Sequence, residues 1–287
     1  MSDTPDSAQR EYWDTVAGPK WIRLGLAIES RLEQVNQLLL TQARPMPGER
    51  VLEVGCGTGP TTLPVAVAVE KAGSVLGIDI AEPMLMAARE RVLAAGLPNI
   101  TLELADAQTH SFEPNGFDLV VSRFGVMFFE HPVAAFANML EALRPGGRLC
   151  FVCWAGIAEN PHWQLPFDIA VRHLGPPSPR PPHAPGPLAF SDKTYVAAIL
   201  AEAGFAGISV TAANCDLVGA SMQQEVDMAC EMGPSGSLVV ERQPDAASLQ
   251  AVKDEITVAF APYMMGSQIV LPAGLLVVQA NKPSLSR

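Results

Sequence analysis

The sequence predicts an α/β fold, in which one domain is built on a doubly wound, mostly parallel seven-stranded sheet with helices on both faces. Three observations predict it: strand and helix patterns alternate from residue 50 to 155, most strand patterns are continuous apolar runs, and a glycine-rich segment follows the first of them. Strands that are buried on both faces read as unbroken apolar runs, and their alternation with helices indicates parallel crossovers.

The elements of this core follow one another closely along the chain. Helices need 3.6-residue periodicity, and Pro83 suits the first turn of one of them because its missing N–H would be unpaired there anyway. Arg144 to Gly147 form a turn that ends another helix. The expected strands are 50–54, 74–80, 100–104, 117–122 and 148–154, and the expected helices are 61–72, 83–95 and 133–143.

The segments on either side of the core, 1–45 and 156–287, belong to the same domain. Residues 1–45 form a helical segment, with apolar residues at helical spacing over 9–42, and we expect this segment to cover the ligand site of the 46–155 core. Residues 176–187 hold seven prolines and form a loop. After the loop we expect a helix at 192–203 capped by Ser191, a strand at 208–211, mostly helix at 221–262 and a strand at 275–280. The loop and the later helices form either a lid or a fixed extra layer.

Composition and charge restrict the class of partner. The chain has 30 acidic and 19 basic residues, and a surface that binds nucleic acid needs clustered Lys and Arg, so a nucleic-acid substrate is disfavoured. The polar N-terminus is unlike a signal peptide, and no apolar run is long enough to insert into a membrane, so a cytoplasmic protein is expected. Cys150 and Cys153 lie three apart on a predicted strand and so point to opposite faces, which indicates structural thiols and no metal site.

The glycine-rich segment, Glu53 to Gly59, lets the backbone turn sharply and approach a ligand closely. Two cofactor classes compete for such a loop. A nicotinamide dinucleotide needs the spacing GxGxxG, whereas this loop has GxGxG with Glu53 immediately before it. A carboxylate there repels a pyrophosphate and suits a ligand with an ammonium and a sulfonium group. The loop therefore favours S-adenosylmethionine.

Four motifs in order extend this conclusion: Glu53 to Gly59, Asp79 after the second strand, Asp106-Ala107 after the third, and Leu143 to Leu149 before the fifth. With them, residues 50–155 resemble the class I S-adenosylmethionine-dependent methyltransferases, particularly the branch with the ubiquinone and menaquinone biosynthesis enzymes. The resemblance implies a Rossmann-like fold and methyl transfer. The rest of the chain resembles that family only loosely.

The resemblance also implies roles for individual residues. Asp79 would accept hydrogen bonds from both ribose hydroxyls, Asp106 and Ala107 would bind the adenine edge, and aromatic residues of the N-terminal segment would close over the cofactor. The expected cofactor-binding residues are Glu53, Gly55, Cys56, Gly57, Gly59, Asp79, Ile80, Met84, Asp106, Ala107, Ser122, Tyr12, Trp13 and Trp21.

On the acceptor side, the methyl donor is already electrophilic, so the protein mainly has to align it with the acceptor. A base is needed only if the acceptor must lose a proton, and His131 and His162 are the candidates. His131 precedes a proline, and this arrangement also suits a helix cap. Arg123, which ends the fourth strand beside the transferable methyl, is the third candidate on the acceptor side.

The sequence thus predicts a methyltransferase that acts on oxygen or carbon of a small, aromatic or apolar metabolite. The alternatives are a cofactor-binding protein of the same fold that transfers nothing, and an NAD(P)-dependent oxidoreductase. No metal is expected, and a homodimer is left open.

Overall fold

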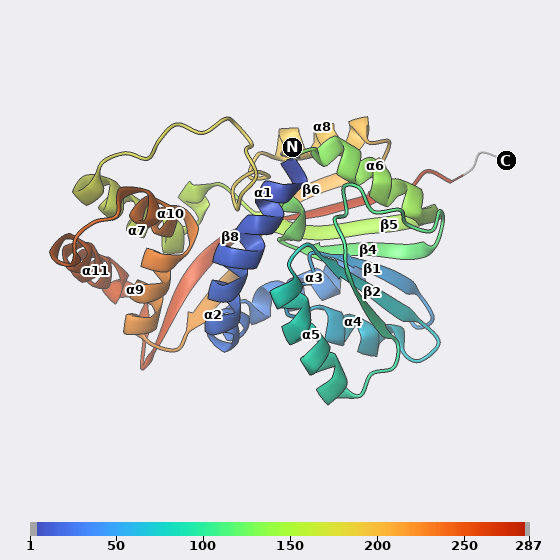
Figure 1. Cartoon of the computed structure of the whole chain (residues 1–287), viewed down its shortest axis with the longest axis horizontal. Helices are drawn as coiled ribbons and strands as arrows, with labels where there is room; N and C mark the ends of the chain where they lie inside the picture. The colour runs from blue at the N-terminus through green and yellow to red at the C-terminus, as the bar shows by residue number, and fades with distance from the viewer. Residues whose placement is uncertain (1–4, 285–287) are drawn as a thin grey trace.

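The structure, a computed structural model, describes residues 5–284 and has one continuous sheet (Figure 1). The strand order is β3-β2-β1-β4-β5-β8-β6; β1 to β5 pair in parallel, and β8 is antiparallel to both its neighbours. This confirms the predicted seven-stranded, mostly parallel arrangement, to which a short strand beside β8 adds an eighth. The strands are β1 Arg50–Val54, β2 Ser74–Asp79, β3 Ile100–Leu104, β4 Phe117–Arg123, β5 Leu143–Trp154, β6 Ala206–Gly219, β7 Met264–Met265 and β8 Gln268–Asn281.

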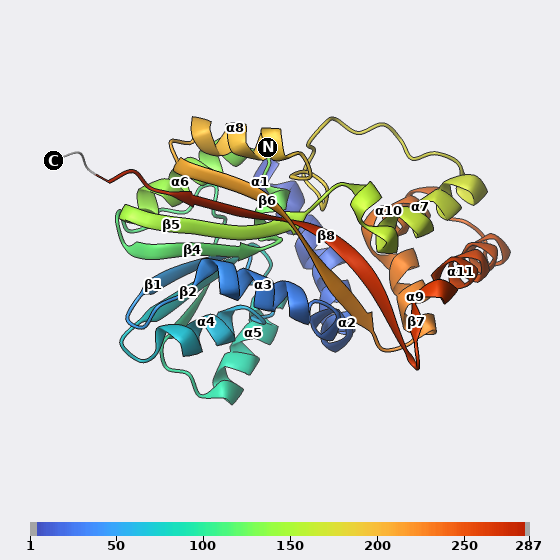
Figure 2. The same cartoon turned by 180° about the vertical axis from the view of Figure 1, so that it is seen from behind.

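Helices cover both faces of this sheet, as predicted. One face carries α3 (Glu33–Ala43), α4 (Thr62–Val69) and α5 (Glu82–Ala95), and the other carries α6 (Pro132–Ala142) and α8 (Lys193–Glu202) (Figures 1 and 2). The strand order reverses between β1 and β4, and in such sheets the ligand crevice lies beyond the carboxyl ends of the strands at that point.

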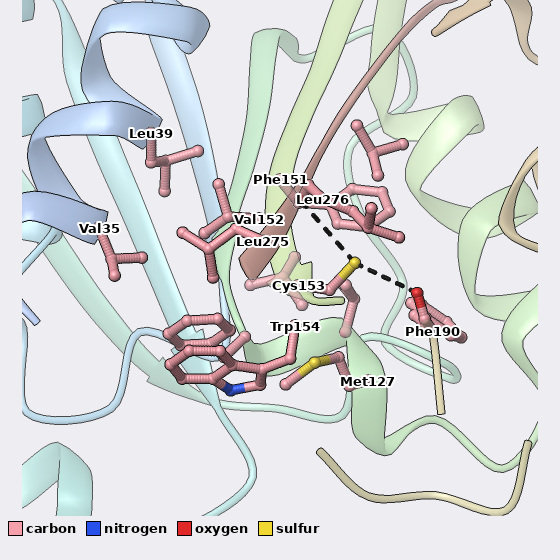
Figure 3. Close-up of a cluster of buried hydrophobic side chains, with 14 of the residues drawn as sticks. Val35, Leu39, Met127, Phe151, Val152, Cys153, Trp154, Phe190, Leu275 and Leu276 are labelled. Atoms are coloured by element: carbon pink, nitrogen blue, oxygen red, sulfur yellow. Dashed lines mark hydrogen bonds between the residues drawn. The ribbon is translucent and has the colours of Figure 1, made fainter. Parts of the chain in front are cut away.

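Strand β5 shows how the sheet separates two buried layers (Figure 3). Val152 points toward Val35 and Leu39 of α3, whereas Cys153 points to the other face, where its thiol lies 3.5 Å from the carbonyl oxygen of Phe190. Cys150 is buried as well and, three residues before Cys153, belongs to the α3 face. Both cysteines are free, so the prediction of structural thiols on opposite faces is confirmed.

The N-terminal segment is helical but interrupted. It consists of α1 (Pro5–Tyr12), a π-helical turn (Trp13–Ala17) and α2 (Gly18–Arg31), and Leu32 separates α2 from α3. Pro19 has no N–H to donate, and the N–H of Gly18 bonds to the carbonyl of Trp13, five residues back, which makes the turn π-helical.

The C-terminal part departs most from prediction. β6 and β8 extend well beyond the parallel core, and four helices gather at the far end of this pair (Figure 2). The helices within 221–262 were predicted, whereas the helix after Trp154 was missed, and both strands are far longer than expected. These helices are α7 (Pro161–Leu174), α9 (Met222–Glu231), α10 (Gly233–Arg242) and α11 (Ala246–Phe260).

The predicted cap of α8 was wrong by one residue. The side chain of Asp192, and not that of Ser191, accepts from the backbone N–H groups of Thr194 and Tyr195, at 2.8 and 3.3 Å. Ser191 instead donates its hydroxyl to the carbonyl of Leu188. No helix within residues 5–284 is long and apolar enough to cross a membrane.

Candidate cofactor and acceptor site

A cavity opens beyond the carboxyl ends of the parallel strands, where the strand order reverses. We call it the strand-end cavity; it holds about 1100 Å³ of empty space, part of it open to solvent. The glycine loop after β1 forms its floor, the ends of β2, β3 and β4 form its sides, and α2 closes it from above. The fold therefore builds its crevice where the glycine loop was expected to hold a ligand.

The glycine loop depends on the absence of side chains. Gly55 has a φ of +69°, and a Cβ atom on it would lie 2.7 Å from the Cα of Gly125. Gly57 also has a positive φ, of +56°, and its N–H donates to the carboxylate of Asp79 at 2.8 Å. The loop after β1 thus packs directly on the segment after β4, and its backbone faces the cavity.

Asp79 ends β2 and is held by the backbone on both sides. One carboxylate oxygen accepts from the N–H of Gly57 at 2.8 Å and the other from the N–H of Ala81 at 2.9 Å. Burial raises the pKa of this carboxyl, while these backbone donors oppose the rise. Each carboxylate oxygen keeps a second lone pair, so the group can still accept from two hydroxyls of a ligand.

Glu53 lies at the bottom of the cavity and is 1% exposed. Burial raises its pKa to about 7, and the nearby charge of Asp79 adds to the rise. The hydroxyl of Thr62, which donates to Glu53 at 2.6 Å, and the charge of Arg123 act in the opposite direction. Two buried carboxyls whose ionisation is disfavoured form a site that a cationic ligand would stabilise, and the ammonium and sulfonium groups of S-adenosylmethionine fit this requirement.

Asp106 lies beyond β3, on the side of the cavity where adenine was expected. Its carboxylate accepts from the backbone N–H of Gln108 at 2.8 Å, and Ala107 beside it lines the cavity. Gln108 lines the cavity as well, and its side-chain oxygen accepts from the backbone N–H groups of Glu130 and His131. Sequence reasoning missed Gln108, because its role depends on a segment more than twenty residues later.

Most of the predicted cofactor residues meet at this cavity. Those that line it are Glu53, Gly55, Cys56, Gly57, Asp79, Ile80, Met84, Asp106, Ala107, Trp13 and Trp21, and Arg123, predicted on the acceptor side, lines it too.

Five predicted residues lie elsewhere, and one of them, His162, belongs to the second cavity described below. Ser122 is fully buried and ties two strands together, because its hydroxyl donates to the carbonyl of Val54 at 2.7 Å and accepts from the N–H of Gly125. Gly59 lies behind the loop, against Ala88, and so shapes it from outside. Tyr12 and His131 do not line the strand-end cavity; Tyr12 borders a second cavity.

His131 is exposed at the N-cap of α6, and its side chain makes no capping bond. It lines neither cavity, so its position gives no support to the prediction that it acts as a base. Within residues 5–284 no cluster of three or more His, Cys, Asp or Glu side chains has the geometry to hold a metal.

The second cavity, which we call the helix-lined cavity, has about 1410 Å³ of empty space, again partly open. It lies between α2 and the α7, α9 and α10 helices. All four tryptophans of the chain line it, together with Met127, Met228 and Met232. Large aromatic surfaces and adaptable methionines suit a flat apolar molecule.

The two cavities share four aromatic residues on their border: Trp13, Trp21, Phe124 and Phe128. Trp13 contacts Phe128 edge to face, at 5.0 Å between ring centroids, and Phe124 stacks on Trp154 at 4.4 Å. The same four rings line both cavities, so a ligand in either cavity would lie beside them.

The helix-lined cavity also holds buried polar groups. Arg31 of α2 donates to Glu225 of α9 at 2.8 Å, and their side chains are only 11% and 2% exposed. His162 of α7, the other candidate base, is 2% exposed and lines the same cavity. No local pattern predicts the Arg31–Glu225 pair, because the two residues are 194 positions apart.

We expect Gly55→Ala to lower the free energy of unfolding by about 2 kcal/mol or more, because it adds a steric conflict to an unfavourable backbone conformation. Gly96→Ala is the matched control: Gly96 also has a positive φ, of +63°, but has open space around it. Chemical denaturation should show a loss of about 1 kcal/mol for the control. If both variants lost the same free energy of unfolding, the close contact between Gly55 and Gly125 would not contribute to the effect.

We expect Glu53→Gln to stabilise the ligand-free protein at alkaline pH. The folded-state pKa of about 7 lies above the ordinary value of 4.5, so this group's stabilising contribution is complete below 4.5 and is lost as the pH rises toward 7. Over this pH range the free energy of unfolding should fall by about 3 kcal/mol at most. Denaturation at about pH 5 and about pH 8 should show a weaker pH dependence in the variant than in the wild type. The same decline in both proteins would exclude Glu53 as its source.

Comparison with known proteins gives the same family as the motifs. Residues 51–147 match the family model described as a methyltransferase domain. The aklanonic acid methyltransferase DauC of a Streptomyces species is 42% identical over 117 residues, which is 41% of this chain and 53% of that protein. A demethylmenaquinone methyltransferase of Listeria monocytogenes is 28% identical over 178 residues, 61% of this chain and 74% of that protein.

The fold has solved counterparts as well. The YcgJ protein of Bacillus subtilis superposes with a TM-score of 0.57 at 16% identity, covering 88% of this chain and 99% of the other, which supports the fold alone. The chain spans about half the length of DauC, so that likeness concerns one half of each protein. Residues 51–147 are thus similar to methyltransferase domains, in agreement with the family that the motifs of the sequence resemble.

Proposed function

We propose that this protein is an enzyme that transfers the methyl group of S-adenosylmethionine to an oxygen or carbon atom of a small, aromatic or otherwise apolar metabolite. The observation that carries the proposal is the shared border of the two cavities, formed by Trp13, Trp21, Phe124 and Phe128. One cavity has the glycine loop and carboxylates that suit the cofactor, and the other is lined by aromatic and methionine side chains. Methyl transfer requires two such sites side by side.

In this proposal, Asp79 binds the ribose hydroxyls and Asp106 with Ala107 binds the adenine, as the family resemblance implies. Glu53 faces the cationic end of the cofactor, and its buried carboxyl becomes ionised when that charge arrives. Ile80 and Met84 line the cavity wall and provide apolar contact for the base.

When bound, the cofactor supplies a methyl group on a positively charged sulfur. The protein holds the acceptor against the aromatic border, aligned with that methyl group, and excludes water from it. Arg123 lines the strand-end cavity close enough to lower the pKa of Glu53, and it provides a fixed positive charge there. This positive charge would suit an anionic group of the cofactor or of the acceptor.

The remaining sequence predictions are consistent with this proposal. A small molecule, and not a nucleic acid, is the expected partner, given the formal charge of −11. Residues 1–45 would cover the cofactor, because Trp13 and Trp21 line its cavity, while 156–287 would carry the acceptor site. The cytoplasmic location stays a prediction, and the homodimer and the choice between a lid and a fixed extra layer stay open.

The test has two steps on the full chain. Calorimetry with S-adenosylhomocysteine, with NAD as the control ligand, should show binding of the first only. Incubation with methyl-labelled S-adenosylmethionine and a panel of hydroxylated aromatic acceptors should then label at least one acceptor. Binding without labelling of any acceptor would favour a binding protein of the same fold, and absence of binding would refute the proposal.

A further inference from the structure

The helix-lined cavity has a polar end that lies away from the cofactor side. Three side chains form it, His162 from α7, Arg31 from α2 and Glu225 from α9, and none of the three lines the strand-end cavity. His162 lies against Trp154, with 5.1 Å between ring centroids, and Trp154 stacks on Phe124 of the shared border. The ring of Trp154 thus separates His162 from the border.

His162 is buried and its hydrogen-bonding capacity is not fully used. The residue is 2% exposed, and within residues 5–284 neither ring nitrogen makes a hydrogen bond of good geometry. The carbonyl of Pro272 is near enough to raise the pKa of the ring, and a bond to it would use the ring N–H and leave the other nitrogen as an acceptor. The ring packs between Trp154 and Trp163, which is 4.9 Å away between centroids. A neutral imidazole has one donor and one acceptor, and a buried polar atom that stays unpaired costs about 1–3 kcal/mol. A ligand in the cavity would supply the missing partner.

The positive charge that acts on this ring, that of Arg31, already has a counter-ion. Arg31 is paired with Glu225, and Lys20, also on the cavity wall, lies 3.5 Å from the backbone carbonyl of Glu231. Burial and the charge of Arg31 lower the pKa of His162 well below its ordinary value, which the nearby carbonyl of Pro272 only partly opposes, so the ring is neutral at pH 7. Beside His162, a cationic group of a ligand would meet the guanidinium of Arg31, and an anionic group would find Arg31 already paired, so an uncharged group fits this position.

This inference rests on the proposed methyl transfer and narrows its substrate class. We propose that the polar end of the helix-lined cavity recognises an uncharged hydroxyl group of a flat aromatic acceptor, and that a ring nitrogen of His162 accepts the hydrogen bond from it. This hydroxyl is remote from the atom that receives the methyl group, since Trp154 and Phe124 lie between His162 and the cofactor side. His162 therefore binds the acceptor and is not the base that the sequence suggested.

Two probes with the same ring system test this inference. 2-Naphthol has a hydroxyl donor, and 2-methoxynaphthalene does not. Calorimetry on the full chain with saturating S-adenosylhomocysteine should show that the wild type binds 2-naphthol about fivefold to tenfold more tightly, the effect of one hydrogen bond. In His162→Phe, which keeps an aromatic ring between the tryptophans, the ratio of the two affinities should fall to about one.

Two further variants separate hydrogen bonding from packing. His162→Gln keeps an acceptor oxygen and should retain more of the preference than His162→Phe. His173→Gln, three turns along the same helix and paired with Glu255 at the surface, should keep the wild-type ratio. Failure of the wild type to bind 2-naphthol, equal binding of both probes, or an unchanged preference in His162→Phe would overturn the inference.

The outcome is independent of the methyl-transfer test. Binding of S-adenosylhomocysteine and labelling of acceptors are measured separately on the same protein, and the probes can be titrated without the cofactor product. If no acceptor is labelled but the wild type still prefers 2-naphthol, the proposed function alone is refuted. If an acceptor is labelled but the two probes bind equally, the hydroxyl subsite alone is refuted.

Discussion

Asp79→Asn should weaken the binding of S-adenosylhomocysteine about 100-fold while leaving the fold intact. Both carboxylate oxygens of Asp79 already accept backbone N–H groups, from Gly57 and Ala81, and the proposed ribose hydroxyls use the remaining lone pairs. An asparagine would turn a donor NH₂ group toward one of these donors and would remove the charge. Hydrogen bonds to charged groups contribute about 1.5–3 kcal/mol each, so loss of one or two gives a change of this size.

The control for this prediction is Asp118→Asn. Asp118 also lies on a parallel strand, β4, but at the opposite edge of the sheet, where it accepts from the backbone N–H of Arg50 at 2.8 Å. Calorimetry should show an unchanged dissociation constant for this variant. If both variants weakened binding equally, the effect would come from the stability of the sheet, and Asp79 would have no direct role in binding the cofactor.

Glu225→Gln should lower the free energy of unfolding by about 3–5 kcal/mol, because it leaves the guanidinium of Arg31 buried without a counter-ion. The two side chains are 2% and 11% exposed and join α9 to α2 across the helix-lined cavity. The double variant Arg31→Met with Glu225→Leu should recover most of this loss, because two apolar side chains carry no unpaired charge. Chemical denaturation of the wild type, the single variants Arg31→Met and Glu225→Leu, and their double variant measures the coupling directly.

An exposed ion pair on the same helix provides the matched control. Arg23 pairs with Glu231, and their side chains are 58% and 35% exposed. Arg23→Met should lower the free energy of unfolding by less than about 1 kcal/mol, because solvent screens this pair. If Glu225→Gln lowered the free energy of unfolding no more than Arg23→Met does, the Arg31–Glu225 pair would not hold α9 against α2.

The cofactor side was predictable because its signals are local. Glu53 and Asp79 lie at the end of a strand whose apolar run is readable in the sequence, and the loop glycines and Asp106 follow such a strand. Parallel strands bring their carboxyl ends to one edge of the sheet. Ser122 was the exception: it ends a strand in the right place, but its hydroxyl bonds to Val54 and points away from the cavity. The position of a residue along a strand predicts at which edge of the sheet it lies, but it does not predict where each side chain points.

The acceptor side was less predictable because it depends on distant segments. His131 and His162 were equal candidates in the sequence, each flanked by a proline, yet one is exposed and the other is buried among tryptophans. Arg31 and Glu225 meet only because the long β6–β8 pair carries α9 back to α2. Alternating exposed residues in β6 conceal its length, since its pattern lacks the continuous apolar run of the core strands.

The central claim is that the strand-end cavity holds the cofactor and the aromatic border lies between it and the acceptor. A crystal structure of the full chain with S-adenosylhomocysteine tests this most directly. We predict ribose hydroxyls on Asp79, the adenine beside Asp106, and the sulfur directed toward Trp13, Trp21, Phe124 and Phe128. A nucleoside bound in the helix-lined cavity, or a sulfur directed away from those four rings, would contradict it.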